Sequence, residues 1–169
     1  EQGHADSQYM VGRYLEEGLD GIAKKAYEAV LWYRKAAEQG HKDAQFKLGQ
    51  FLCEGKGTAK DEKEGLVWYK KAAEQGHAEA KTAAYKIEGI IKKREAFYNL
   101  VQSANNGVVS AQYELAKRFV NGDGVVRDDA EAYEWYRKAA EQGHADSQYM
   151  VGRYLEEGWS GIAKKAYEA

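Results

Sequence analysis

The sequence contains no proline and a single cysteine, Cys53. Because there is no second cysteine, an internal disulfide cannot form, and the redox state of the compartment stays open. The 25 basic and 27 acidic side chains leave a net charge of −2, which provides no electrostatic footprint for nucleic acid or an anionic membrane. No apolar run approaches the roughly 20 residues of a membrane-spanning helix. We therefore expect a soluble protein with no nucleic-acid partner and no membrane insertion.

Motifs that carry chemistry are also scarce. The glycine-rich loops at Gly55 and Gly122 are not followed by Gly-Lys-Ser/Thr, so no nucleotide site is predicted. Cys53 has no partner histidine in any recognisable pattern, which argues against a thiol nucleophile. Four histidines recur at equivalent places, about 10 Å apart in a regular stack, which is too far to share one metal ion. They are His4, His41, His77 and His144. We predict no catalytic residue, no cofactor and no metal site.

What the sequence does have is a stretch of 13 residues that occurs three times, at 29–41, 65–77 and 132–144. Its pattern is Ala/Gly-x-x-Trp-Tyr-x-Lys-Ala-Ala-Glu-Gln-Gly-His. The first two copies begin 36 residues apart. A period in the thirties is typical of a stacked array of small supersecondary units, so the chain is interpreted as a repeat protein.

Each repeat is predicted to hold two helices. In the copy at 132–144 the apolar residues fall at i, i+3, i+4, i+7 and i+8, which is one face of an α-helix. That copy is the second helix of its repeat. The first helix is expected over about 6–17 in the first repeat, 43–54 in the second and 110–121 in the fourth, and each is ended by a glycine. Between the two helices lies a glycine-bearing loop, and its last residue is placed to cap the second helix. These capping residues are Asp61 and Asp128.

The sixth residue of the first helix is small in four repeats. Glycine inside a helix costs about 1 kcal/mol relative to alanine, so its recurrence at one position predicts a close helix–helix crossing. The residues are Gly12, Gly49, Ala116 and Gly152.

These patterns predict a single array over 1–169. The third repeat is divergent: it is about five residues shorter, the loss falls between its helices, and Asn99 stands at the tryptophan position. The expected repeats are 4–40, 41–76, 77–107, 108–143 and an incomplete 144–169.

Residues 1–29 and 141–169 agree at 27 of 29 positions, at an offset of 140 residues or four repeats. Either a block of four repeats was duplicated, or the chain was cut or engineered so that both ends lie within the same repeat. The divergent third repeat argues against a consensus design. We therefore favour duplication and expect the chain to be a fragment of a longer array.

The second repeat shows the full motif, which is Ala44, Leu48-Gly49, Gly55-Lys56-Gly57, Asp61, Trp68-Tyr69, Ala72-Ala73 and Gly76. This pattern resembles the Sel1-like repeat, a relative of the tetratricopeptide repeat. The resemblance implies an all-α fold, a right-handed αα-superhelix of about four and a half repeats. It also implies a non-enzymatic adaptor or scaffold that holds a protein or peptide partner. Large arrays of this family are common in bacteria, so we expect a bacterial protein, either periplasmic, secreted or cytoplasmic.

Position three of the first helix is aromatic in four repeats, about 160° from the apolar stripe, and a polar or basic residue follows four positions later. The aromatic rings either pack between successive first helices or line a concave groove for a peptide with some acidic character. The candidates for partner binding are Tyr9, Arg13, Phe46, Gln50, Tyr113, Lys117, Tyr149 and Arg153.

Two other functions stay open. The matching ends are consistent with a structural spacer or a rod that self-associates end to end. The second alternative is a hydrolase acting on cell-wall or antibiotic substrates, for which no nucleophile–base pair is visible.

Overall fold

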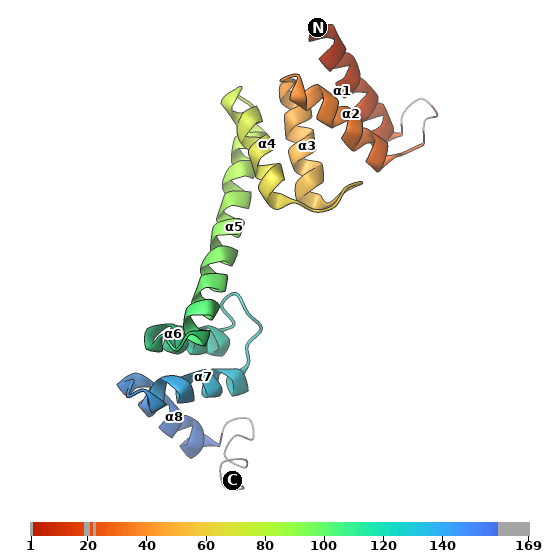
Figure 1. Cartoon of the computed structure of the whole chain (residues 1–169). Coiled ribbons are helices and arrows are strands. Elements are labelled where there is room, and N and C mark those ends of the chain that lie inside the picture. The colour runs from red at the N-terminus through yellow and green to blue at the C-terminus, as the bar shows by residue number, and fades with distance from the viewer. Residues whose placement is uncertain (1, 19–20, 22, 159–169) are drawn as a thin grey trace. The chain divides into compact units, whose positions relative to one another are not determined.

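The computed structural model describes residues 2–18, 21 and 23–158, which form eight α-helices and no strand (Figure 1). None of these helices is both long enough and apolar enough to span a membrane. The predicted all-α class is confirmed, whereas the right-handed superhelix stays a prediction. The helices are α1 (Gln2–Glu17), α2 (Ala26–Glu38), α3 (Lys42–Glu54), α4 (Glu62–Glu74), α5 (Ala78–Asn105), α6 (Val109–Asn121), α7 (Asp129–Glu141) and α8 (Ala145–Glu157).

The chain divides into two compact parts, here called unit 1 (Glu1–Lys92) and unit 2 (Lys93–Ala169). Helices pack against their neighbours in chain order within each unit. The pairs α1–α2, α3–α4 and α6–α7 are the helix hairpins of single repeats, and α2–α3 and α7–α8 join one repeat to the next.

In these hairpins the helices end and begin at residues that the sequence predicted, a glycine at the end of the first helix and an aspartate at the start of the second. Gly55 ends α3 in the left-handed conformation, with φ 70°, and its N–H donates to the carbonyl of Phe51. The Asp61 carboxylate then accepts a hydrogen bond of 2.8 Å from the backbone N–H of Glu64 and caps α4. Asp128 caps α7 in the same way, so both predicted caps are confirmed.

The close crossing predicted at position six is present in both hairpins of unit 1. A Cβ placed on Gly12 would lie 2.7 Å from Cε1 of Tyr33, and one on Gly49 would lie 2.8 Å from Cδ1 of Tyr69. Both distances are too short for a real methyl group, so the tyrosine ring lies directly on the glycine backbone. Tyr33 is fully buried and Tyr69 is buried as a consequence.

A ladder of buried glutamines, which the sequence analysis did not identify, joins successive repeats. The side-chain amide of Gln45 donates to the carbonyl of Ala37 at 3.1 Å, and its oxygen accepts from Gln75 at 2.8 Å. In unit 2, Gln142 donates to Gln112 at 2.8 Å. Because buried amides are costly unless they are hydrogen-bonded, the bond from Gln45 to Ala37 helps to hold the first two repeats in one register, whereas the glutamine–glutamine pairs join the two helices of one hairpin.

The third repeat departs from the prediction of two helices. Residues 78–105 form one uninterrupted helix, α5 (Figure 1). Ile91 stands where Gly55 ends α3 in the second repeat, and the residues that follow contain no glycine and no capping aspartate. Lys92 to Ala96 are instead strong helix formers, so nothing stops the helix. All five of these residues are exposed, and the boundary between the two units falls among them.

A second feature also prevents a hairpin in the third repeat. Tyr85 occupies position six, where Gly12 and Gly49 allow a helix to approach closely. Its side chain is 83% exposed, whereas both glycines are buried. A phenol ring at this position would collide with a second helix packed at the usual distance.

We expect Gly49→Ala to lower the free energy of unfolding by about 1–3 kcal/mol, because the added methyl group overlaps the Tyr69 ring. Gly89→Ala is the matched control, since nothing lies within 4 Å of the Cβ position at Gly89 in α5. That change should raise the free energy of unfolding by up to about 1 kcal/mol through helix propensity. Urea denaturation followed by circular dichroism measures both, and equal effects of the two substitutions would contradict the close crossing.

Candidate protein-binding site

The aromatic residues predicted at position three stack on the histidines at the repeat junctions. In unit 1 the Tyr9 ring stacks on His41 with centroids 4.5 Å apart, and Phe46 stacks on His77 at 4.4 Å. Tyr9 also lies 5.8 Å from the Tyr33 ring. Each aromatic side chain is half-buried, so one part of the ring packs against the repeat and the rest faces solvent.

Among the residues of unit 2 that the structure describes, the same arrangement occurs at Tyr113. Tyr113 lies 4.6 Å from the His144 ring and is half-buried. Tyr149 in α8 is 67% exposed. In α5, Thr82 and Lys86 take positions three and seven, so the aromatic series is interrupted in the third repeat.

The junction histidines cap the helices that follow them. Nδ1 of His41 accepts a hydrogen bond of 3.1 Å from the backbone N–H of Ala44, and His77 caps α5 in the same way through Ala80 at 3.2 Å. Nε2 of His41 lies 3.2 Å from a carboxylate oxygen of Asp6, which fixes the proton on Nε2. In the described part of the chain, no group of three or more His, Cys, Asp or Glu residues is arranged to hold a metal ion.

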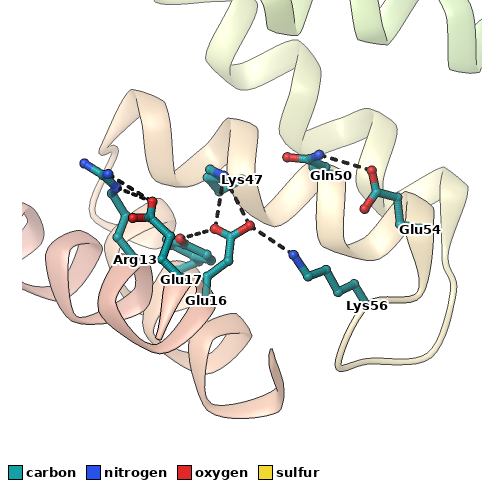
Figure 2. Close-up of polar contacts among 8 residues, drawn as sticks. Arg13, Glu16, Glu17, Lys47, Gln50, Glu54 and Lys56 are labelled. Atoms are coloured by element: carbon teal, nitrogen blue, oxygen red, sulfur yellow. Dashed lines mark hydrogen bonds and ion pairs between the residues drawn. The ribbon is translucent and has the colours of Figure 1, made fainter. Parts of the chain in front are cut away.

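The polar residues predicted at position seven have acidic partners on their own helices. Figure 2 shows two of these contacts, between Arg13 and Glu17 at 2.9 Å and between Gln50 and Glu54 at 3.1 Å. In unit 2, Lys117 pairs with Glu114 at 3.1 Å, and Arg153 pairs with Glu157. A carboxylate from a partner would therefore have to displace the acidic side chain that is already paired. These pairs could be expected from the sequence, because their members lie three or four residues apart on one helix.

Glu16 lies at the centre of a polar cluster that joins the first two repeats. Its carboxylate accepts hydrogen bonds from the Tyr33 hydroxyl at 2.6 Å, from Lys47 and from Lys56 at 3.1 Å. In Figure 2 both lysines point at the Glu16 carboxylate from α3 and the loop after it. Burial alone would raise the pKa of Glu16, but these hydrogen bonds together outweigh burial and hold the pKa below its usual value.

In the described part of the chain, this cluster occurs only between the first two repeats. The position of Glu16 is taken by Cys53 in the second repeat and by Val120 in the fourth. Burial raises the pKa of the Cys53 thiol to about 11, so the thiol stays protonated near neutral pH and is a poor nucleophile.

An open groove of about 510 Å³ lies between α1, α3 and the start of α5 in unit 1. It brings together Tyr9 and Phe46, the position-three residues of two consecutive repeats. Arg13 and Gln50 are not among its lining residues. Charges of both signs surround the rings, so the groove is not uniformly basic. The main lining side chains are Tyr9, Asp43, Phe46, Lys47, His77 and Glu79.

We expect the Glu16 cluster to make unit 1 sensitive to acid. Because the folded-state pKa of Glu16 lies below the usual value for a glutamate, the stabilisation is present above the unfolded pKa. It is lost as the pH falls through the folded pKa. Glu16→Gln should therefore lower the free energy of unfolding by about 1–2 kcal/mol at neutral pH and flatten its decline between about pH 6 and about pH 3.

Glu156 provides a matched control, because residues 146–157 of α8 repeat the sequence of 6–17 in α1 and Glu156 is exposed. Glu156→Gln should leave the pH dependence of stability unchanged. Urea denaturation of both variants at several pH values measures the difference. An unchanged acid response in Glu16→Gln would rule out the cluster as its source.

Comparison with known proteins identifies the repeats. The Sel1 repeat family model matches residues 5–41, 42–77, 109–144 and 145–169. Residues 78–108 lie between these matches, and this is the stretch in which α5 replaces a helix hairpin. The interruption of the motif in the sequence thus coincides with the interruption of the fold.

Relatives and solved structures of the same kind are known. Chitin synthase regulatory factor 3 of Schizosaccharomyces pombe is 34% identical over 143 residues, which are 83% of this chain and 12% of that protein. The structure of c5321, a protective antigen of uropathogenic Escherichia coli with an SLR fold, is 30% identical with a TM-score of 0.51. The match covers 92% of this chain and 34% of c5321.

A Sel1 repeat protein from Oxalobacter formigenes is 29% identical with a TM-score of 0.49, over 92% of this chain and 65% of that one. The chain therefore spans less than two thirds of the length of each of these proteins. The resemblance inferred from the motif is confirmed. Since four matched repeats cover most of its length, the chain belongs to the Sel1 repeat family.

Proposed function

We propose that this chain is a non-enzymatic adaptor that binds a segment of another protein in the groove of unit 1. The observation that carries the proposal is that Tyr9 and Phe46 line one open groove of about 510 Å³. These two rings come from consecutive repeats, and each keeps part of its surface exposed to solvent.

The chemistry of the groove supports a particular kind of ligand. His77 lies between two carboxylates, 3.6 Å from Asp43 and 3.1 Å from Glu79, and Lys47 lies on the same wall. Aromatic platforms next to charges of both signs suit a peptide with an apolar or aromatic anchor and flanking polar groups. Arg13 and Gln50 lie outside this groove and are proposed to contact polar or acidic side chains of the partner. In unit 2, Tyr113, Lys117, Tyr149 and Arg153 form a separate set of proposed binding residues of the same kind.

The relatives support a binding role in preference to catalysis. The name of the yeast protein describes a regulatory factor, and Sel1 repeats provide an interaction surface in this proposal. The buried, protonated Cys53 offers no support for the hydrolase alternative. A bacterial origin stays a prediction, because the similar proteins come from bacteria and from a yeast.

The groove can be blocked without removing any packed side chain. Ala78 is the exposed first residue of α5 and lines the groove, and the corresponding residue of α3 is Lys42. A long basic side chain is therefore compatible with the fold at this place. We expect Ala78→Arg to fill part of the groove and to abolish capture of the partner from a lysate of the source organism, read by mass spectrometry.

The matched control is Ala145→Arg, the same substitution at the first residue of α8. A partner should be retained by the wild type and by Ala145→Arg and lost with Ala78→Arg, while circular dichroism shows equal helicity. If all three forms retain the same proteins in equal amounts, the groove of unit 1 is not the binding surface.

A further inference from the structure

The turn between α5 and α6, residues 105–108 of unit 2, has the same backbone as the other described repeat junctions but different side chains. The glycine of each junction is in the left-handed conformation, with φ of 82° to 88°, and its N–H donates to the carbonyl three residues earlier at 2.9 to 3.1 Å. These glycines are Gly40, Gly76, Gly107 and Gly143. The Gln-Gly-His of the other junctions is replaced here by Asn106, Gly107 and Val108.

Two side-chain interactions that hold the other junctions are missing at this turn. The side-chain amide of Gln142 donates to Gln112 at 2.8 Å, but that of Asn106 makes no hydrogen bond in the described part of the chain. His144 caps α8 through Nδ1, whereas the side chain of Val108 has no polar atom and leaves α6 without a side-chain cap. The described hydrogen bonds of this turn are therefore made by the backbone alone, and the turn should open more readily than the other three.

We propose that Asn106 is a site of spontaneous deamidation, an irreversible modification that this weakly held turn permits. In an Asn-Gly pair the side-chain carbonyl carbon and the next backbone nitrogen close a five-membered ring, and glycine has no side chain to obstruct the attack. Asn106 is exposed, so water reaches it. A glutamine at this place has to close a six-membered ring, which forms much more slowly. One methylene group per side chain therefore protects the other three junctions.

The reaction consumes water and releases ammonia, without oxidation or reduction. The backbone nitrogen of Gly107 loses its proton and forms a bond to Cγ of Asn106. The bond from Cγ to Nδ2 breaks, and the amide nitrogen leaves as ammonia with that proton. Water then opens the succinimide at one of its two carbonyl carbons, which gives aspartate or isoaspartate. The hydrogen bond from Gly107 to Ala104 has to open before the attack, so the rate depends on how firmly the turn is held.

The products alter the connection between α5 and α6. A carboxylate is added just beyond the C-terminal end of α5, where the helix dipole disfavours negative charge. Isoaspartate also inserts a methylene group into the backbone of the turn, in which the N–H of Val108 donates to Ser103 at 3.0 Å. We expect aged protein to unfold at a lower urea concentration than fresh protein.

Ageing of the protein at mildly alkaline pH, followed by tryptic mapping and mass spectrometry, tests the proposal. The other Asn-Gly pair of the sequence, Asn121 and Gly122, is the matched control, because Asn121 is the last residue of α6. Attack at Asn121 also breaks up the end of that helix, so Asn106 should react roughly tenfold faster. The two pairs fall on different tryptic peptides, 95–117 and 119–127. An intact Asn106, or equal rates at the two sites, overturns the proposal.

Unfolded protein shows whether the difference comes from the structure. In concentrated urea the two Asn-Gly pairs should react at similar rates. A difference that persists there would come from the neighbouring residues in the sequence and would contradict the role of the turn.

Two substitutions test the turn directly. Val108→His supplies an imidazole that can accept from the N–H of Ala111, as His41 does from Ala44, and should slow deamidation of Asn106 roughly fivefold. Asn106→Gln should remove both the modification and the loss of stability on ageing. An unchanged rate in a Val108→His variant of normal helicity would refute the link between the missing cap and the reactivity.

Discussion

The contact between a tyrosine ring and a glycine backbone is the constraint on which the hairpins of unit 1 depend. In unit 1 the Tyr33 ring lies on Gly12 and the Tyr69 ring on Gly49, at distances that leave no room for a methyl group. The contact sets how closely two helices approach and buries the rings of Tyr33 and Tyr69. Where Tyr85 replaces the small residue and the glycine-bearing loop is missing, the hairpin disappears and a helix of 28 residues takes its place.

Most residues of the recurring motif make contacts that stabilise the fold. The Glu-Gln-Gly-His ending of the second helix supplies the donor of each glutamine pair and the histidine that caps the next helix. The glutamine pair joins the two helices of one repeat, and the histidine joins the end of that repeat to the helix that follows. The third repeat has Lys81 and Asn106 at the two glutamine positions, so the ladder is interrupted in the same repeat that loses its hairpin. The position of Glu16, by contrast, differs between repeats, with Cys53 in the second and Val120 in the fourth.

The stacking of repeats explains why binding is proposed on the first helices. Tyr9 and Phe46 are 37 residues apart in sequence, yet the regular packing of α1, α2 and α3 brings both rings to one groove. Each ring stacks on a junction histidine, which positions the ring and leaves part of its surface exposed to solvent. Asp43, Lys47 and Glu79 line the same groove, so it combines aromatic platforms with charges of both signs.

The sequence by itself determined both helices of the first, second and fourth repeats and the first helix of the last. It also determined the Asp61 and Asp128 caps, the small residue at the crossing and the family, because each depends on residues close together in the chain. It also held the signal for α5, since Tyr85 and the absence of glycine after Ile90 were visible, but a two-helix prediction was drawn from the repeat pattern and was wrong. Only the tertiary structure decided the glutamine ladder, the Tyr33–Glu16–Lys56 cluster and the groove. Their atoms come from different repeats, and the distances between them depend on how the repeats pack.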